Sequence, residues 1–219
     1  MTEEFQIRKV VAEVLEKLAG EEQKAPSAGF KVPIVFSNRH VHLSQEDFEY
    51  LFGPGCALSP MKDLSQPGQF ACRETVTLVG PKGVFQGVRI LGPFRKASQV
   101  EISISDSFAL GISPPPPVRD SGDHEGTPGI VVVGPRGALN LKKGLIVAQR
   151  HIHMTPADAE KQGLQDRQYV RVSVEGERPL IYEKVLIRVN PDYALDMHVD
   201  LDEANAAALQ SGQMAGIIK

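Results

Sequence analysis

The sequence has no tryptophan and only two cysteines among its 219 residues. Two cysteines, Cys56 and Cys72, cannot build the disulfide framework of a small secreted domain, so we expect two reduced thiols in a cytoplasmic protein. No apolar run approaches the ~18 residues of a membrane span. An excess of one charge is also missing, since 24 basic and 27 acidic residues leave a net charge of −3. Contacts with nucleic acid or membrane are therefore not expected.

Several catalytic motifs are absent as well. The chain contains no Gly-x-Ser-x-Gly, no P-loop and no Gly-x-Gly-x-x-Gly, and neither cysteine has a histidine beside it in the sequence. Without a nucleophile motif, attack assisted by a metal ion is a better expectation than a covalent enzyme intermediate.

Histidines provide the strongest positive signal, because five of the six fall into three tight groups. His40 and His42 form one His-x-His, His151 and His153 form a second, and His198 stands alone. On a strand, His-x-His places both imidazoles on one face, since strand side chains alternate with a period of two. Two such pairs with a fifth histidine are enough for two transition-metal ions, and zinc fits best.

A carboxylate often completes such a site, and Glu101 and Glu74 are the candidates on expected strands. For either residue alone, a solvated surface position is the alternative reading. Arg95 follows a Gly/Pro-rich turn and could bind an oxyanion through two parallel hydrogen bonds. Arg39 and Arg150 precede the two histidine pairs, and we expect them to be structural ion pairs or groups at the edge of a cleft.

The first residues form a separate element. Residues 2–19 show apolar side chains at helical spacing with Glu and Lys on the other face, and residues 21–28 have the polar composition of a linker. The apolar stripe could pack on the chain's own domain or dock on another protein, and the pattern alone leaves both open.

From residue 30 onward the pattern is mostly strand. The expected strands are short, β-branched and bounded by Gly or Pro, which favours antiparallel barrels over a parallel α/β sheet. They are residues 32–37, 75–79, 84–90, 100–105, 130–133, 144–148, 169–174 and 183–189. Residues 80–83 and 134–137, both Gly-Pro-x-Gly, are expected hairpin turns, and the four prolines 114–117 an extended spacer.

Helix start signals follow each histidine pair. Ser44 with Asp47, and Thr155 with Asp158, resemble capping boxes. A third helix is expected at about 201–211, capped by Asp200 and ended by Gly212. Residues 34–44 also parallel residues 145–155, so two related halves would each present a histidine pair to a shared cleft.

Seven segments together resemble the PduL family of phosphotransacylases, also called phosphate propanoyltransferases. The segments are Ser37-Asn-Arg-His-Val-His-Leu43, Leu64-Ser-Gln-Pro-Gly-Gln-Phe70, Thr75-Val-Thr-Leu-Val-Gly-Pro-Lys-Gly83, Arg89-Ile-Leu-Gly-Pro-Phe-Arg95, Gln99-Val-Glu-Ile-Ser103, Arg150-His-Ile-His-Met154 and Met197-His-Val-Asp200. They are distributed over most of the range 32–205. The family motif does not require His124, which is left out of the expected site.

The resemblance implies a mainly β fold with two small β-barrels capped by short α-helices, and an N-terminal amphipathic helix on a linker. Residues 1–20 would be an encapsulation-type helix and residues 21–28 its linker. Residues 29–38 and 149–219 would form the first barrel, and residues 39–148 the second.

The activity implied is reversible transfer of a short acyl group, propanoyl or acetyl, between coenzyme A and inorganic phosphate. Arg95 matches the arginine expected to bind phosphate, and Glu101 matches the family's metal position better than Glu74. Two zinc ions per chain would lie between the barrels, held by His40, His42, Glu101, His151, His153 and His198. Coenzyme A would contact Ser37, Lys62, Arg89, Leu91, His198 and Asn205.

The resemblance also implies a location in the bacterial cytoplasm, inside the lumen of a microcompartment such as one for propanediol degradation. Residues 2–19 would then bind shell or core proteins, and the enzyme would be a homo-oligomer. Two rival functions use the same histidines. One is a dinuclear zinc hydrolase that acts on a thioester or a related substrate with water, and the other is a metal-binding scaffold without turnover.

Overall fold

The computed structural model describes residues 30–218, so the expected helix at residues 1–20 and linker at residues 21–28 lie outside the described residues. Within this range the chain is mainly β with a few short helices, which confirms the predicted fold class. No helix in the described range is long and apolar enough to cross a membrane.

The elements alternate between strands and short helices along the chain. The helices are α2 (Gln45–Phe52), α3 (Ile104–Leu110), α4 (Pro156–Gln162) and α5 (Leu201–Ala206). The strands are β1 (Lys31–Ser37), β2 (His40–His42), β3 (Pro60–Asp63), β4 (Phe70–Val79), β5 (Val84–Gly92), β6 (Gln99–Glu101), β7 (Val118–Arg119), β8 (Ile130–Val133), β9 (Ala138–Leu141), β10 (Leu145–Ala148), β11 (His151–Met154), β12 (Tyr169–Val174), β13 (Leu180–Val189), β14 (Asp196–Asp200) and β15 (Met214–Ile218).

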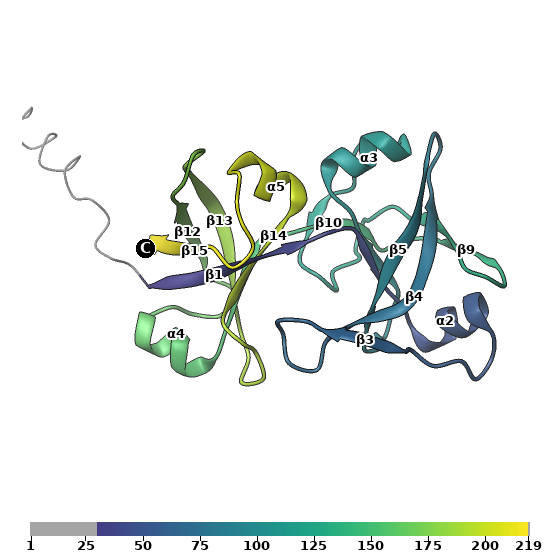
Figure 1. Ribbon diagram of the computed structural model, residues 1–219, viewed down its shortest axis with the longest axis horizontal. Coiled ribbons are helices and arrows are strands. Elements are labelled where there is room, and N and C mark those ends of the chain that lie inside the picture. Colours follow the sequence, from purple (N-terminus) through teal and green to yellow (C-terminus); the bar gives the residue numbers. More distant parts are fainter. Residues whose placement is uncertain (1–29, 219) are drawn as a thin grey trace, which may run out of the picture.

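One unit of the molecule is a closed six-stranded barrel in the order β1-β14-β11-β13-β12-β15 (Figure 1). It closes because β1 pairs in parallel with β14 and antiparallel with β15. Its interior is an apolar cluster in which Ile34, Ile152, Val172 and Ile187 are fully buried. Helices α4 and α5 lie on opposite sides of this barrel in Figure 1.

The other unit is a curled sheet in the order β7-β10-β6-β2-β5-β4-β8-β9, with β3 added beside β4. It encloses its own apolar cluster, which includes the fully buried Leu78, Ile90 and Cys72. No ladder joins β8 to β10 among the described residues, although Leu145 N donates to Pro128 O at 3.0 Å near that edge. This unit is therefore a curled half-barrel, whereas the family resemblance implied a second small barrel.

The chain exchanges strands between the two units. β1 belongs to the barrel and the next strand, β2, to the curled sheet, while β10 belongs to the curled sheet and β11 to the barrel. Both crossings therefore occur at two-residue links, Asn38-Arg39 and Gln149-Arg150, that stand directly before a His-x-His. Each histidine pair consequently begins at the boundary between the units.

The strand orders of the two units correspond one by one. The barrel order β1-β14-β11-β13-β12-β15 matches β10-β6-β2-β5-β4-β8 in the curled sheet. The direction of pairing also agrees between matched strands. β11 with β13 and β2 with β5 are both parallel, and β11 with β14 and β2 with β6 are both antiparallel. The internal repeat predicted from residues 34–44 and 145–155 thus extends to most of each unit.

The two helices predicted after the histidine pairs are present. Ser44 caps α2 and accepts a hydrogen bond from Asp47 N, while Thr155 and Asp158 form a reciprocal capping box at α4. The Asp47 carboxylate instead accepts a hydrogen bond from Ser98 Oγ. Each histidine strand therefore leads directly into a helix whose start is fixed by its own sequence.

Two other predictions of local structure were wrong. The strand expected at residues 100–105 ends at Glu101, because Ser103 and Asp106 form a capping box that begins α3. The helix expected at residues 201–211 ends at Ala206, and Gly212 (φ 81°) lies in the turn before β15. The cap by Asp200 was predicted correctly.

The Gly-Pro-x-Gly turns join β4 to β5 and β8 to β9, as predicted, and each docks on the end of a helix. Lys82 N donates to Leu110 O of α3, and Arg136 N donates to Leu51 O of α2, both at 3.0 Å. A Cβ atom at the first glycine, Gly80, would lie 2.4 Å from Leu110 O. Glycine is required there because the turn backbone lies against the helix.

Both cysteines are free thiols. Cys72 is completely buried in the core of the curled sheet, and burial raises the pKa of its thiol to about 11. Residues 114–117 form no strand, and they lead into the short strand β7.

Candidate active site

A cavity of about 490 Å³ opens where the barrel meets the curled sheet, and both histidine groups line it. Polar residues from both units contribute to its wall. They include His40, His42, Lys62, Gln66, Arg89, Arg95, Glu101, Ser121, His151, His153, Arg188 and His198. The shared cleft that the repeat predicted is therefore present.

On the curled-sheet side, His40, His42 and Glu101 form a buried group that could hold a metal ion. β2 and β6 pair antiparallel with His40 opposite Glu101. Nε2 of His40 lies 3.4 Å from one oxygen of Glu101, and Nε2 of His42 lies 4.0 Å from the other. The ligand atoms of a tetrahedral zinc ion, with bonds of about 2 Å, stand about 3.3 Å apart, which is close to this spacing.

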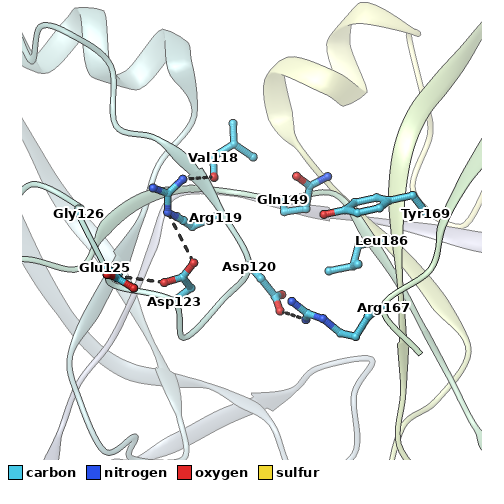
Figure 2. Close-up of a pocket in the computed structure, with 10 residues that line it drawn as sticks. All are labelled: Val118, Arg119, Asp120, Asp123, Glu125, Gly126, Gln149, Arg167, Tyr169 and Leu186. Carbon is cyan, nitrogen blue, oxygen red and sulfur yellow. Dashed lines mark hydrogen bonds and ion pairs between the residues drawn. The ribbon is translucent and has the colours of Figure 1, made fainter. Parts of the chain in front are cut away.

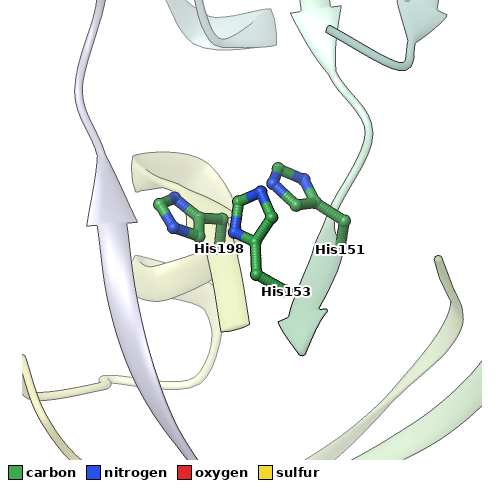
Figure 3. A group of neighbouring side chains, drawn as sticks. All are labelled: His151, His153 and His198. Carbon is green, nitrogen blue, oxygen red and sulfur yellow. The ribbon is translucent and has the colours of Figure 1, made fainter. Parts of the chain in front are cut away.

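On the barrel side, His151, His153 and His198 form the matching group (Figure 3). β11 and β14 pair antiparallel with His151 opposite His198. His40 of β2 lies opposite Glu101 of β6 in the same way. The rings of His151 and His198 are stacked with centroids 5.0 Å apart, and His153 lies edge-on to both. Glu101 and His198 are therefore equivalent third members of two related groups.

Hydrogen bonds to backbone carbonyl oxygens fix the orientation of three imidazoles. Nδ1 of His40 lies 2.7 Å from Asn38 O, and Nδ1 of His151 lies 2.8 Å from the equivalent Gln149 O. Nδ1 of His42 similarly lies 3.2 Å from a backbone carbonyl oxygen. Since a carbonyl oxygen only accepts, each Nδ1 must carry a proton, and in the neutral ring the Nε2 lone pair is free for a metal.

His153 is oriented by a carboxylate instead. Its Nδ1 lies 3.0 Å from Oδ1 of Asp196, whose side chain is 3% exposed. Burial opposes ionisation of Asp196, but interaction with His153 holds the pKa of this carboxyl well below its usual range. A buried carboxylate behind an imidazole is a common support for a metal ligand.

The site also contains buried polar atoms without hydrogen-bond partners among the described residues. They are Nε2 of His198 and Oδ2 of Asp196. His198 Nε2 stands 3.1 Å from Asp196 Oδ1 without forming a hydrogen bond. Unpaired buried polar atoms carry a free-energy cost, which a bound cation beside them would offset.

The protonation of the histidines suits metal binding. Burial, reinforced by neighbouring histidines, holds the pKa of His42 and of His151 well below the ordinary value. Burial also lowers the pKa of His153. His40 differs, because the adjacent Glu101 raises its pKa against the effect of burial. Most of these imidazoles are therefore neutral near pH 7, the form that coordinates metals.

Of the two candidate carboxylates, the structure places Glu101 beside the histidines. Glu101 is buried, and although burial opposes its ionisation, His40 holds its pKa well below the ordinary value. Glu74 lies elsewhere and accepts a hydrogen bond from Ser59 N at 3.1 Å.

Arg95 lines the same cavity, and Ser121 connects it to Glu101 through two hydrogen bonds. Its Nη1 donates to Ser121 Oγ at 2.7 Å, and Ser121 Oγ donates to Glu101 at 2.9 Å. Gln99 donates to the same Glu101 oxygen at 2.6 Å. His124, outside both metal groups, lies 2.9 Å from the Gln99 side-chain oxygen.

Arg39 and Arg150 are structural ion pairs, as predicted, and again they match. Arg39 binds Asp106 at 2.6 Å, and Arg150 binds Glu203 at 2.7 Å. Each carboxylate is the third residue of a helix, α3 or α5, and closes that helix's capping box. The Asn38-Arg39 link is thereby bound to α3, which follows Glu101, and the Gln149-Arg150 link is bound to α5, which follows His198.

Comparison with known proteins gives a consistent result. A sequence profile described as phosphate propanoyltransferase matches residues 33–210. A phosphate propanoyltransferase of Thermotoga maritima is 60% identical over 184 residues, which are 84% of this chain and 87% of that protein. Proteins of the same name from Listeria monocytogenes (53% identical; 86% and 87% of the chains) and Alkaliphilus metalliredigens (48%; 99% and 99%) also align.

The chain belongs to the phosphate propanoyltransferase family. It is accordingly an acyltransferase, as the resemblance implied, and the cavity between its two units is the place where both histidine pairs, Glu101 and Arg95 converge.

The residues that the family resemblance assigned to coenzyme A fall into two sets. Ser37, Lys62, Arg89, Leu91 and His198 line the cavity, while Asn205 is exposed on α5 and lies outside its lining. Arg89 uses one nitrogen to bind two backbone carbonyl oxygens, those of Cys72 and Arg73. The contacts of these six residues with coenzyme A stay predictions.

Sequence reasoning missed several residues of the cavity and its support. Arg188, Gln66 and Ser121 line it, and Asp196 stands behind His153. Gln66 is almost completely buried and exchanges two hydrogen bonds with the backbone of Ala194, so it links the two units. Two of these residues carried a usable signal. Asp196 stands two residues before His198 as Gln99 stands before Glu101, and Gln66 lies in a segment that resembles the family.

A second cavity, of about 500 Å³, lies beside the Gln149-Arg150 crossing (Figure 2). Its wall combines the 118–126 loop with barrel residues such as Arg167 and Tyr169. Arg167 pairs with Asp120, and Arg119 pairs with Asp123 at 3.6 Å. Neither candidate metal group lies in this wall, so we assign the catalytic role to the first cavity.

The support by Asp196 can be tested by substitution. Asp196→Asn should weaken metal binding at the His151 group by about 10- to 100-fold, because the amide cannot supply the charge behind His153. Metal titration with a competing chelator measures this. Asp158→Asn is the matched control, since Asp158 caps α4 and should affect stability without changing metal affinity. Equal metal affinities in all three proteins would contradict the assignment.

Proposed function

We propose that the protein reversibly transfers a propanoyl or acetyl group between coenzyme A and inorganic phosphate, at a site that binds two zinc ions. The observation that carries the proposal is the pair of three-membered ligand groups, His40-His42-Glu101 and His151-His153-His198, that line one cavity together with cationic side chains. Membership of the phosphate propanoyltransferase family supports the reaction type.

The side chains present suit zinc. Neutral imidazoles and one carboxylate are ligands that zinc accepts, and three protein ligands leave a further position open, as in catalytic sites. When bound, the two ions would supply Lewis acidity for the thioester carbonyl and for the phosphate oxygens.

The cationic residues would position the substrates. Arg95 would hold phosphate so that one of its oxygens attacks the carbonyl carbon of acyl-coenzyme A, forming a carbon–oxygen bond. The tetrahedral intermediate collapses with cleavage of the carbon–sulfur bond, and the electron pair leaves with the coenzyme A thiolate. The products are acyl phosphate and coenzyme A, and the reverse sequence makes acyl-coenzyme A.

Other residues of the cavity wall suit coenzyme A. Lys62 and Arg89 line it and can face the phosphates of the cofactor. Ser37 lies near His198, with 3.5 Å between Ser37 Oγ and His198 Nδ1. The thiol end of the substrate would accordingly approach the metal groups from the β1–β2 crossing.

The competing function is hydrolysis of a thioester by the same ligands. Arg95 favours phosphate as the acceptor, because water needs no guanidinium to bind it. A thiol-release assay separates the functions: acetyl- and propanoyl-coenzyme A should release thiol with phosphate and not without it. Release at the same rate without phosphate would identify a hydrolase, and no release in either condition would favour a metal-binding scaffold.

We propose further that the enzyme is a homo-oligomer that acts in the bacterial cytoplasm inside a microcompartment, with residues 2–19 binding shell or core proteins. The support is the apolar stripe of residues 2–19 and the polar composition of residues 21–28. The aligned region of the Alkaliphilus metalliredigens relative spans 99% of this chain, so it includes most of this segment.

Deletion of residues 1–28 tests this role. The shortened enzyme should keep its metal content and specific activity and self-associate less, because an apolar stripe that binds partners has been removed. Light scattering, elemental analysis and the thiol-release assay measure these properties. A fusion of residues 1–20 to a fluorescent protein should enter microcompartments in a host that makes them. Loss of zinc from the shortened enzyme would show that the segment belongs to the core.

A further inference from the structure

The two halves of the cavity share their metal groups but differ in the residues on the neighbouring strands. β2 pairs with β5 so that His40 lies opposite Arg89, and β11 pairs with β13 so that His151 lies opposite Leu186. Two residues further on, Leu91 of β5 therefore corresponds to Arg188 of β13, which lies opposite His153. Each half thus has one arginine and one leucine, in exchanged positions.

This exchange places Arg188 in the cavity wall, beside the three-histidine group. Its side chain is 22% exposed and lines the cavity together with Arg95. Tyr193, whose ring packs edge-on against His153 at 4.4 Å, accepts a hydrogen bond from Arg188 Nη2 at 3.2 Å. That contact fixes the guanidinium next to a metal ligand.

The nearest carboxylate leaves Arg188 incompletely paired. Nη1 of Arg188 is 3.6 Å from Oδ1 of Asp120, too far for a hydrogen bond, and Oδ1 has no hydrogen-bond partner among the described residues. The other oxygen of Asp120 accepts a hydrogen bond from Arg167. A guanidinium has five N–H donors, so Arg188 retains several for a ligand.

The charge of Arg188 also acts across the cavity. Burial lowers the pKa of Arg95, Glu101 opposes this, and the positive charge of Arg188 lowers the pKa further. Arg188 therefore stands close enough to Arg95 for the two guanidinium groups to act on one anion.

We propose that Arg188 binds the transferred phosphate directly, as a second guanidinium that works with Arg95. This inference rests on the phosphotransacylase function proposed above. Phosphate carries between one and two negative charges near pH 7 and has four oxygens, so one arginine leaves oxygens that a second fork can bind. Leu91, at the equivalent place in the other half, supplies no guanidinium beside His42.

A structural role is the alternative, in which Arg188 only holds the 118–123 loop against the barrel through Asp120. Arg167 already holds Asp120 by a shorter contact from the barrel side. The two roles give different kinetics, because loss of a loop contact affects both substrates, whereas loss of a phosphate-binding group affects phosphate.

The test compares full-length, zinc-loaded wild type with Arg188→Leu, which installs the residue of the other half. The KM for phosphate should rise by about 10- to 100-fold, the usual effect of removing a charge-assisted hydrogen-bonding group. The KM for acetyl-coenzyme A and the metal content should change less than about twofold. Inorganic phosphate should also raise the midpoint of thermal unfolding of the wild type more than that of the variant.

Asp120→Asn is the matched control, since it removes the charge that Arg188 faces outside the cavity. Its phosphate KM should stay within about twofold of the wild type, and a defect equal to that of Arg188→Leu would overturn the proposal. Unchanged phosphate KM in Arg188→Leu would overturn it as well. If Arg188→Leu does not fold, Arg188→Lys keeps the positive charge and should still show a raised phosphate KM, because an ammonium lacks the planar fork.

Failure of the underlying function would look different. A wild-type enzyme that releases thiol at the same rate with and without phosphate would reject the phosphotransacylase proposal itself. A phosphate-dependent wild type with unaltered Arg188 variants would reject only the role of Arg188.

Discussion

His40→Ala and His151→Ala are each expected to remove about one of the two zinc ions proposed above and to reduce turnover by ~1000-fold or more. Each substitution takes one ligand from a group of three, and the remaining pair cannot hold the ion against competing water and buffer. The ion in the other group should stay, because the two groups share no side chain and no strand. Elemental analysis of the purified variants and the thiol-release assay measure both effects.

His124→Ala is the control for this experiment, because His124 lies outside both groups. It should retain two zinc ions per chain. Full activity of His40→Ala in the absence of bound metal would disprove the metal-dependent mechanism. Loss of both ions from either variant would instead show that the two groups bind cooperatively.

Arg95→Lys is expected to lower kcat/KM for phosphate by ~100-fold, within the range seen when a group that stabilises a transition state is removed. An ammonium keeps the charge but loses the planar fork that can hold phosphate and Ser121 together. Metal content should not change, since Arg95 is not a ligand in either group. Initial rates at varied phosphate and at varied acyl-coenzyme A give the two constants.

Arg171→Lys serves as the matched substitution. Arg171 forms an exposed ion pair with Glu183 on the outside of the barrel, and such pairs contribute little to stability. Its kinetic constants should equal those of the wild type. Normal phosphate kinetics in Arg95→Lys would show that Arg95 has a structural role, through Ser121 and the backbone contact to Leu43.

Much of the site could be predicted from the sequence because its signals are local. The His-x-His spacing depends only on the period of a strand, so the sequence alone places His40 with His42, and His151 with His153, on common faces. Ser44 and Thr155 indicated the next helices through caps, which act over three residues.

Other parts could not be predicted because tertiary contacts decide them. Ile102 and Ile104 favoured a continuing strand, yet the Ser103–Asp106 capping box begins α3, and Arg39 from the distant crossing pairs with Asp106. Arg188 lies in a strand with no motif around it. Its importance appears only when β13 is placed beside β11, so the pairing of strands about 35 residues apart had to be known first.

The strand exchange at the two crossings has a consequence for biosynthesis. β1 leaves the ribosome first among the described strands, but its partners are β14 and β15. The pairing of Lys31 with Gly216 therefore cannot form until almost the whole chain has been synthesised. Pairing over such separations slows folding, and an unpaired apolar strand promotes aggregation in the meantime. The curled sheet needs strands only up to β10 and could assemble earlier, with its His40-His42-Glu101 group. A chain interrupted before β14 would therefore hold one of the two metal groups and lack the other half of the catalyst.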